Sequence, residues 1–386
     1  MQKQTIVMLE ASGHGKICHS TFSLCHALAR NGYDVTLITS RDYELDELPR
    51  SFDVLKLFPC KGSYLFPWYF YLIFRKIRAL KPGILHFQWF PSATLGYALL
   101  KLLKLACRAR LVYTPHNVVP HRKRFSSMAT WARIYREMDA IIVHSQYAKM
   151  AIADIFEVDT ARITVTPETF LFDDSVIDYD AMEARRRLNL PVEARVILFF
   201  GYINHSKGVD QLIAAFPAIQ RAVPGAALAL AGSAGENGSG AETLRRAAGD
   251  NRNIILDLRY IPFKRMLMYF MAADVVTAPY RKICQSPIIK LARAFGKAAV
   301  ATPMAVEDCD DREGVFIASS AGAEDIASAV IMALRSLEGK REGAPRAAHP
   351  GWSEIASGAR NVYAALLDGE PAGMFSGAAS ADRAGY

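Results

Sequence analysis

The sequence has few cysteines for its length, and none of them forms a metal-binding or disulfide pattern. Its 386 residues include six cysteines, and no two of these make a C-x-x-C pair. We therefore expect reduced, mostly buried thiols and no structural zinc site. The six are Cys18, Cys25, Cys60, Cys107, Cys284 and Cys309.

Long apolar segments are also missing. No stretch reaches the ~18–20 uninterrupted apolar residues that a membrane-spanning helix requires. A strand-like run at 5–9 follows the N-terminus almost at once, without a secretory type of leader before it. These features predict a cytoplasmic protein that at most binds peripherally to the inner face of the cell membrane.

Acidic residues are outnumbered by basic ones. The chain has 46 Lys and Arg against 38 Asp and Glu, a formal net charge of +8. This excess favours anionic partners such as phosphates or an acidic membrane surface. The basic runs lack the interleaved aromatic residues of RNA-binding modules, so nucleic acid is not an expected partner.

Two nucleotide-binding fingerprints are absent. A dinucleotide-dependent oxidoreductase needs G-x-G-x-x-G after the first strand, and Cys18 stands where the third glycine belongs. The G-x-x-x-x-G-K order of a phosphate-binding P-loop is also missing around Lys207. Both of these enzyme classes are therefore disfavoured.

The sequence does contain two series of alternating strand-like and helical segments. At about 100–200 residues per domain, the length also suggests two domains. The pattern predicts an α/β fold with two doubly wound parallel sheets, whose ligands bind at the carboxyl ends of the strands. A polar interval at 172–191 is the expected linker. The expected strands are 5–9, 33–39, 84–87, 111–114 and 140–143, then 195–200, 226–231, 254–258, 274–279 and 298–302.

The loop at 201–208 lies between an expected strand and an expected helix. Gly201 and Tyr202 open it, and Lys207 near its end would add a positive charge to the N–H groups of the helix N-terminus. This combination suits a diphosphate. An ordinary strand-to-helix turn with a solvated lysine is the alternative.

A second polar loop, at 278–287, also follows a strand. Ser286 is a natural helix N-cap, and Pro287 suits the first helical position. The N–H groups there, together with Arg281, suit a distal phosphate or sugar hydroxyls. A well-capped ordinary helix explains the same residues.

In the first half, polar residues follow strands in the same way. Gly13 and Gly15 flank His14 and would allow a substrate close to the backbone, although a simple turn needs them equally. His116, followed by Asn117, could hydrogen-bond the transferred sugar or orient an acceptor. A surface histidine is the alternative.

Taken together and in this order, these segments resemble the family-4 retaining glycosyltransferases, which have the GT-B fold. The resemblance implies two Rossmann-like domains facing a central cleft: an acceptor domain at 1–180 and a nucleotide-sugar domain at 181–350. It also implies a helix at 351–368 that crosses back to the first domain, followed by a disordered tail at 369–386. The similar segments are the glycine loop at 12–15, ILHFQW at 84–89, TPHN at 114–117, IIVHS at 141–145, FFGYINHSKG at 199–208, RYIPFKRMLMYFMAADVVTAPY at 259–280, AFGKAAVAT at 294–302 and GWSEIASGARNVYAALL at 351–367.

The resemblance also assigns an activity and residue roles. It implies a retaining hexosyltransferase that uses a UDP- or GDP-sugar, needs no metal or other cofactor, and modifies a glycan or a lipid-linked acceptor, such as a polysaccharide precursor. Lys207 matches a diphosphate-binding lysine and His116 a histidine near the donor sugar, which makes these two the expected catalytic residues. The expected donor-binding residues are Gly13, Gly15, Gly201, Tyr202, Lys207, Arg281 and Ser286, and the expected acceptor-binding residues are His14, Gln88 and Asn117.

The chain departs from the family pattern in two places. Tyr202 stands where an arginine is common, and the two glutamates of an E-x7-E motif fall at Ile283 and Leu291. A non-catalytic or weakly active nucleotide-sugar-binding protein of GT-B shape is therefore the alternative. D-x-D strings at 178–180 and 308–310 could bind a metal-diphosphate, but acidic loops produce such strings easily.

Two segments of the first half combine apolar and basic residues, at 64–81 and 95–110. Basic amphipathic elements of this kind bind anionic membranes, which would bring the enzyme to a lipid-linked acceptor. The alternative is that both helices simply cover the sheet and expose a solvated basic face.

Overall fold

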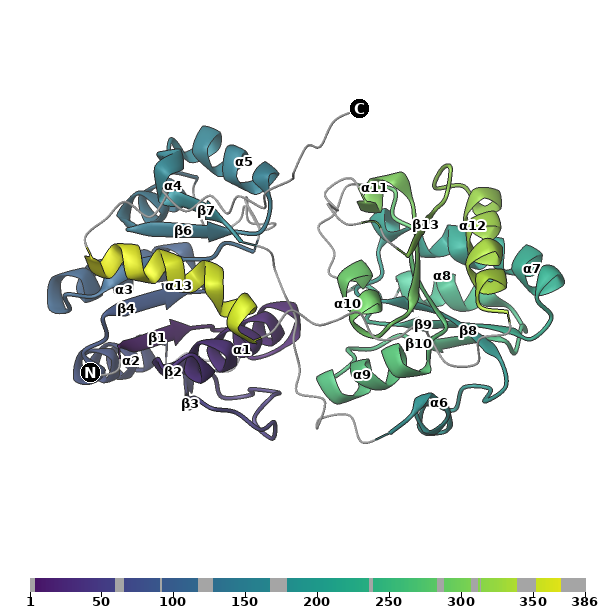
Figure 1. Cartoon of the computed structure of the whole chain (residues 1–386), viewed down its shortest axis with the longest axis horizontal. Coiled ribbons are helices and arrows are strands. Elements are labelled where there is room, and N and C mark those ends of the chain that lie inside the picture. The colour runs from purple at the N-terminus through teal and green to yellow at the C-terminus, as the bar shows by residue number, and fades with distance from the viewer. Residues whose placement is uncertain are drawn as a thin grey trace, which may run out of the picture. The chain divides into compact units, whose positions relative to one another are not determined.

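The computed structural model describes residues 4–59, 66–90, 92–116, 128–166, 179–235, 239–282, 288–306, 312, 314–338 and 352–368. The chain divides into two compact units. Unit 1 contains Met1–Phe172 together with Pro350–Tyr386, and unit 2 contains Asp173–His349. Each unit is built around one parallel sheet with helices against it (Figure 1).

The sheet of unit 1 has seven strands in the order β3-β2-β1-β4-β5-β6-β7, all parallel. All five expected strands are present. Two further strands, β3 and β7, lie at the edges. The bounds are β1 Thr5–Leu9, β2 Asp34–Ser40, β3 Asp53–Phe58, β4 Ile84–Phe87, β5 Arg110–Tyr113, β6 Ala140–Val143 and β7 Ile163–Val165.

The sequence pattern predicts the first helix of unit 1 at about 19–31, with Gly32 directly after its end. The helix starts earlier, at Gly15, because Gly13 and Gly15 adopt positive φ angles of 74° and 73° that turn the chain directly out of β1. Gly32, at φ 92°, follows its end as expected. The helices are α1 Gly15–Arg30, α2 Phe66–Leu80, α3 Ala93–Ala106, α4 Met128–Glu137, α5 Gln146–Phe156 and α13 Trp352–Asp368, with a 3-10 turn at Thr160–Arg162.

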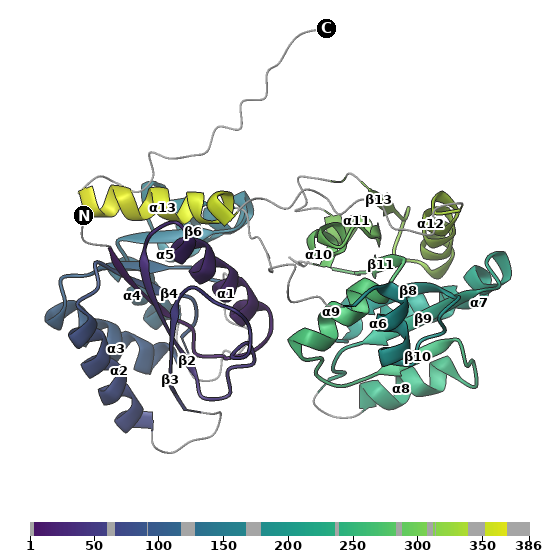
Figure 2. The same ribbon diagram turned by 60° about the horizontal axis from the view of Figure 1, so that its bottom comes forward.

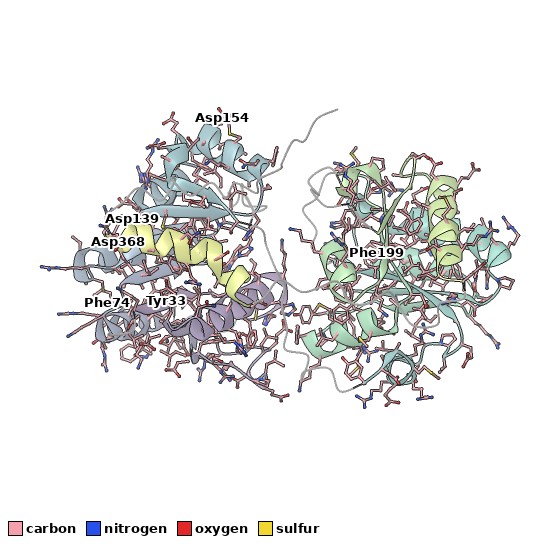
Figure 3. All side chains as sticks on the ribbon, viewed as in Figure 1. Tyr33, Phe74, Asp139, Asp154, Phe199 and Asp368 are labelled. Carbon is pink, nitrogen blue, oxygen red and sulfur yellow. The ribbon has the colours of Figure 1, made fainter. Side chains whose placement is uncertain are left out.

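The C-terminal helix α13 packs within unit 1 although it is distant in sequence. It contacts α1 and β6, and it lies beside α1 in Figure 2. Tyr363 is fully buried, and its ring lies 6.3 Å from that of Tyr33, which is labelled in Figure 3. Arg360 donates to the Asn31 side chain at 2.9 Å. Apolar and polar contacts thus fix this helix in unit 1.

Unit 2 has six parallel strands in the order β10-β9-β8-β11-β12-β13. Its core includes Phe199 of β8, which is labelled in Figure 3 and fully buried. The strands are β8 Arg195–Phe200, β9 Ala226–Ala231, β10 Ile254–Asp257, β11 Val275–Ala278, β12 Ala298–Ala301 and β13 Val315–Ile317. The helices are α6 Ala181–Leu188, α7 Val209–Ala222, α8 Ser239–Ala248, α9 Phe263–Ala272, α10 Ile288–Ala294, α11 Pro303–Val306 and α12 Ala323–Ser336, with a 3-10 turn at His205–Lys207.

Part of the predicted linker is a helix. Asp180 caps α6 by accepting from the Glu183 N–H at 2.8 Å, and Asn189 ends the helix in the left-handed region. Arg185 of α6 donates to Asp274 at 2.8 Å. The charged residues of this interval therefore attach α6 to unit 2 rather than forming a solvated connection.

None of the helices in the described part of the chain is long and apolar enough to cross a membrane. Within the same residues Cys18, Cys25 and Cys107 are free thiols. The predicted domain ranges remain predictions, and the tail at 369–386 lies outside the described residues.

Candidate functional site

The parallel strands of unit 1 gather their following loops at one edge of the sheet. β1, β4, β5 and β6 are consecutive neighbours. The glycine loop, Gln88, His116 and His144 follow these strands in turn, and the His116 and His144 rings lie 5.8 Å apart. The strand order also reverses between β1 and β4, where open α/β sheets bind ligands.

The two glycines of the first loop have different structural roles. A Cβ added to Gly13 would lie 2.7 Å from the Ser40 Cβ, whereas one added to Gly15 would meet nothing within 4 Å. Gly13 is therefore required by packing against β2. Gly15 leaves an open backbone surface at the start of α1, as the predicted donor contact requires.

The N–H groups of this loop are bound by carboxylates of the protein. Buried Glu10 accepts from the N–H groups of Ser12 at 2.7 Å and Gly13 at 3.0 Å. Glu44 accepts from the Gly15 N–H at 2.7 Å and contacts His19 Nε2 at 2.7 Å. A ligand at this loop would therefore meet the Gly15 surface and neighbouring side chains rather than these N–H groups.

A third carboxylate, that of Asp42, lies close to the side chain of His14 in the same loop. His14 Nε2 lies 3.6 Å from an Asp42 oxygen. Glu10, Asp42 and Glu44 were not among the residues predicted from the sequence. The position of Glu10, a carboxylate immediately after a buried strand, was an available signal, because a buried acid needs several donors. The acceptor role of His14 remains a prediction.

His116 is held by Gln88. The Nε2 atom of His116 lies 3.0 Å from Gln88 Oε1, and Gln88 is buried. The Gln88 amide also contacts His86, so both of its ends face histidines. This placement favours an orienting role for Gln88, whose predicted role in acceptor binding remains a prediction. Asn117 lies outside the described residues.

In unit 2 the reversal of strand order falls between β8 and β11, and the two predicted polar loops follow these strands. Gly208 has a φ of 65°, and a Cβ there would lie 1.9 Å from the Pro279 carbonyl oxygen. The Arg281 N–H donates to the Ser206 carbonyl at 2.9 Å. The two loops are therefore in direct contact, which only a glycine at position 208 permits.

Lys207 projects from this pair of loops with its ammonium group oriented by an aromatic ring. Its Nζ lies 3.8 Å from the ring centroid of Tyr280, which is buried. A cation over a ring face is attracted by the ring quadrupole. At the other end of the first loop, Gly201 has a φ of 130° and an open Cα surface.

The guanidinium of Arg281 forms hydrogen bonds and an ion pair within unit 2. Its guanidinium donates to both oxygens of Asp210, at 2.7 and 2.6 Å, and to the His205 carbonyl at 3.0 Å. Partial burial acts to raise the pKa of Asp210, but the hydrogen bonds and charge of Arg281 outweigh it and lower that pKa below its ordinary value. Asp210 was not among the residues predicted from the sequence. The ion pair between Arg281 and Asp210 favours a role for Arg281 in holding the two loops together.

Asp210 also changes the anion site expected at the start of α7. Its carboxylate accepts from the N–H groups of Asp210 and Gln211. Part of the helix N-terminus is thus satisfied internally, so a diphosphate at this site would depend less on these N–H groups and more on Lys207.

Of the remaining predicted donor-binding residues, Tyr202 is exposed and Ser286 lies outside the described residues. The Tyr202 side chain is 49% exposed beside Gly235 and is accessible to a ligand. Ser286 and Ile283 lie outside the described residues, while Leu291 is buried in α10. The position of the second missing glutamate is therefore a packing position in this chain. Among the described residues, no group of His, Cys, Asp and Glu side chains could hold a metal ion.

Comparison with known proteins agrees with this architecture. Residues 19–168 match the model described as Glycosyltransferase Family 4, and residues 194–336 match the model described as Glycosyl transferases group 1. A D-inositol 3-phosphate glycosyltransferase of Segniliparus rotundus is 25% identical over 315 residues, covering 75% of this chain and 68% of the relative.

Two solved structures share the fold at low sequence identity. Anabaena HepE in complex with UDP and glucose superposes with a TM-score of 0.65 at 16% identity, covering 95% of each chain. The catalytic domain of Arabidopsis thaliana starch synthase IV, bound to ADP and acarbose, gives a TM-score of 0.68 at 13% identity, covering 95% of this chain and all 100% of that one.

Two parallel Rossmann-like sheets with this strand order and these neighbours show the GT-B fold, which confirms the predicted fold. The chain belongs to glycosyltransferase family 4 and is a retaining, hexosyltransferase-type enzyme that transfers a sugar from a nucleotide-sugar.

Proposed function

We propose that this enzyme transfers a hexose from a UDP- or GDP-sugar to a glycan or lipid-linked precursor of a polysaccharide, without a metal ion. The observation that carries the proposal is the placement of Lys207, which is oriented by Tyr280 where the loops after β8 and β11 meet. Solved neighbours bound to UDP with glucose, and to ADP, share this fold.

The chemistry follows from where negative charge develops. As the bond between the sugar and the diphosphate breaks, the sugar becomes oxocarbenium-like and the leaving diphosphate gains charge. A preorganised cation stabilises that charge most in the transition state, which lowers the barrier. Lys207 supplies the cation. The acceptor hydroxyl attacks from the same face and passes its proton to the leaving phosphate, while His116 hydrogen-bonds the transferred sugar.

A thermal-shift panel tests the donor class. We expect UDP- or GDP-sugars to raise the melting temperature more than ADP- or dTDP-sugars, because a ligand that binds only the folded state stabilises it by about 2.7 kcal/mol at 100 times its Kd. The Lys207→Ala variant should lose most of this shift. Equal shifts for all four donors, or none, would contradict the proposal.

For the acceptor side we propose contact between α2, α3 and an anionic membrane. Trp68 and Tyr71 are exposed on α2 with their rings 5.6 Å apart, and Leu102 and Leu105 are exposed on α3, Leu105 by 86%. Apolar side chains among cations are typical of peripheral membrane binding. Lys101 and Lys104 both contact Glu137, at 3.0 and 2.6 Å, which reduces their net charge. The exposed cations near these residues include Arg75, Lys76, Arg78 and Arg108.

Vesicle flotation tests this contact. We expect binding to vesicles containing phosphatidylglycerol, none to pure phosphatidylcholine, and release as salt rises, because the attraction of basic residues is screened. Leu102→Glu with Leu105→Glu should lower binding at least about tenfold, since two apolar groups are lost and like charges are added. Met332→Glu, at an exposed methionine of unit 2, is the control. Equal binding to charged and uncharged vesicles, together with equal binding by the wild type and the leucine variant, would refute this contact.

A further inference from the structure

A chain of buried polar side chains connects the C-terminal helix to His116. The Tyr363 hydroxyl lies 2.6 Å from His86 Nδ1, and His86 Nε2 lies 2.7 Å from Thr114 Oγ1 and 3.3 Å from Gln88 Nε2. Gln88 Oε1 then lies 3.0 Å from His116 Nε2. Tyr363, His86, Gln88 and Thr114 are all buried, so these groups satisfy one another rather than water.

The direction of each hydrogen bond follows from the acceptors around Gln88. Its Nε2 lies 3.5 Å from the Met8 sulfur, which can accept but cannot donate, so the amide nitrogen is on the side of Met8 and His86. The Gln88 carbonyl oxygen therefore faces His116. Because that oxygen can only accept, the Nε2 atom of His116 carries the hydrogen.

The same reasoning assigns His86. Its Nε2 accepts, so its single hydrogen is on Nδ1 and is donated to the Tyr363 oxygen. Burial, with smaller effects of the charges of His116 and His144, lowers the pKa of His86 to about 3, so the ring is neutral near pH 7. A neutral ring has only one hydrogen to donate, and therefore the orientation of one group determines that of the next.

We infer that Tyr363, His86 and Gln88 are positioning residues that fix the ring orientation and tautomer of His116, leaving Nδ1 as its acceptor nitrogen. The inference rests on the proposed function, in which His116 faces the transferred sugar. It gives helix α13 a role in positioning His116, because Tyr363 of α13 contacts His86. These two residues are 277 positions apart in sequence.

Histidine tautomers can be read by long-range 15N–1H correlation NMR on the full chain, with the His116 signals assigned from a His116→Gln variant. We expect the Nε2–H tautomer in the wild type. Tyr363→Phe removes the acceptor of the His86 Nδ1–H, so His86 should move its hydrogen to Nε2. The Thr114 hydroxyl oxygen, 2.7 Å from His86 Nε2, can accept that hydrogen. The Gln88 amide nitrogen would then face an N–H group at 3.3 Å, so Gln88 should turn its amide over and His116 should become the Nδ1–H tautomer.

Variants at Gln88 provide the matched comparison. Gln88→Leu removes the acceptor and should give a mixture of His116 tautomers, whereas Gln88→Glu keeps an acceptor oxygen and should preserve Nε2–H. Gln4→Leu, at an exposed glutamine preceding β1, should change nothing. If Gln88→Leu does not fold, Tyr363→Phe and Gln88→Glu still decide the question.

Transfer kinetics separate this inference from the function on which it rests. We expect Tyr363→Phe to lower kcat about tenfold with little change in donor KM, because small losses of orientation are costly in the reacting complex. An unchanged His116 tautomer in Tyr363→Phe would overturn the relay. A changed tautomer with full kcat would support the relay but contradict the proposed role of His116 in transfer.

Discussion

Replacing Lys207 with alanine is expected to lower kcat/KM for sugar transfer by about 10²–10³-fold, the usual cost of removing one preorganised group that stabilises developing charge. The folded structure should persist, because the side chain is only partly buried and its main described contact is the face of Tyr280. The measurement is the initial rate of transfer or donor hydrolysis by purified protein.

Two further variants make this result specific. Lys207→Arg keeps the charge and should retain part of the activity. Arg221→Ala removes a positive charge from an exposed position at the far end of α7 and should be close to wild type. Full activity in Lys207→Ala, or an equal loss in Arg221→Ala, would exclude a local role for the Lys207 ammonium group.

Replacing Gly208 with alanine is expected to lower the free energy of unfolding of unit 2 by about 3–5 kcal/mol. The new Cβ would adopt a left-handed conformation, with φ at 65°, and would lie 1.9 Å from the Pro279 carbonyl oxygen. The backbone of one loop would have to move to relieve that clash. Donor binding should be lost with it, because Lys207 is the neighbouring residue.

Gly249 provides a matched control for this substitution. It also has a positive φ, 56°, but a Cβ there would meet nothing within 4 Å. Gly249→Ala should therefore cost only the conformational term, about 1–2 kcal/mol. Urea denaturation followed by circular dichroism compares the two variants. Equal losses of unfolding free energy in the two variants would mean that the loops after β8 and β11 are not in close contact at Gly208.

Much of the fold could be predicted because the buried strands are strongly patterned. β8 and β9 match their expected bounds, since their apolar runs end at Gly201 and Gly232. The missed strands β3, β7 and β13 are edge strands, and β7 and β13 have only three residues each, too few for a period to be recognised. Helix α6 was missed because half of its eight residues are charged, which gives its segment the composition of a polar linker.

The candidate site was less predictable, because its key contacts join residues far apart in sequence. The loop that contains Lys207 could be found from one short segment. The pairing of Arg281 with Asp210, 71 positions apart, could not, and it changes the role that Arg281 is expected to have. The same applies to Glu44, which contacts Gly15 across 29 positions. Long-range pairs of this kind depend on the register of the sheet, which single segments do not specify.

The position where the family motif has its second glutamate is occupied here by a buried leucine, Leu291. Leu291 is buried between α10 and its sheet, so a glutamate there would have to be accommodated by different packing. Recognition of the sugar and ribose would therefore need other groups in this chain, and the exposed Tyr202 stands in the loop after β8.

We expect Lys207 to bind the diphosphate of the donor. A crystal structure of the protein with a nucleoside diphosphate, UDP or GDP, would show this contact. Its diphosphate oxygens should lie within ion-pair distance of Lys207 Nζ, close to the open surface of Gly201. A well-ordered nucleotide whose phosphates lie away from Lys207 would contradict it.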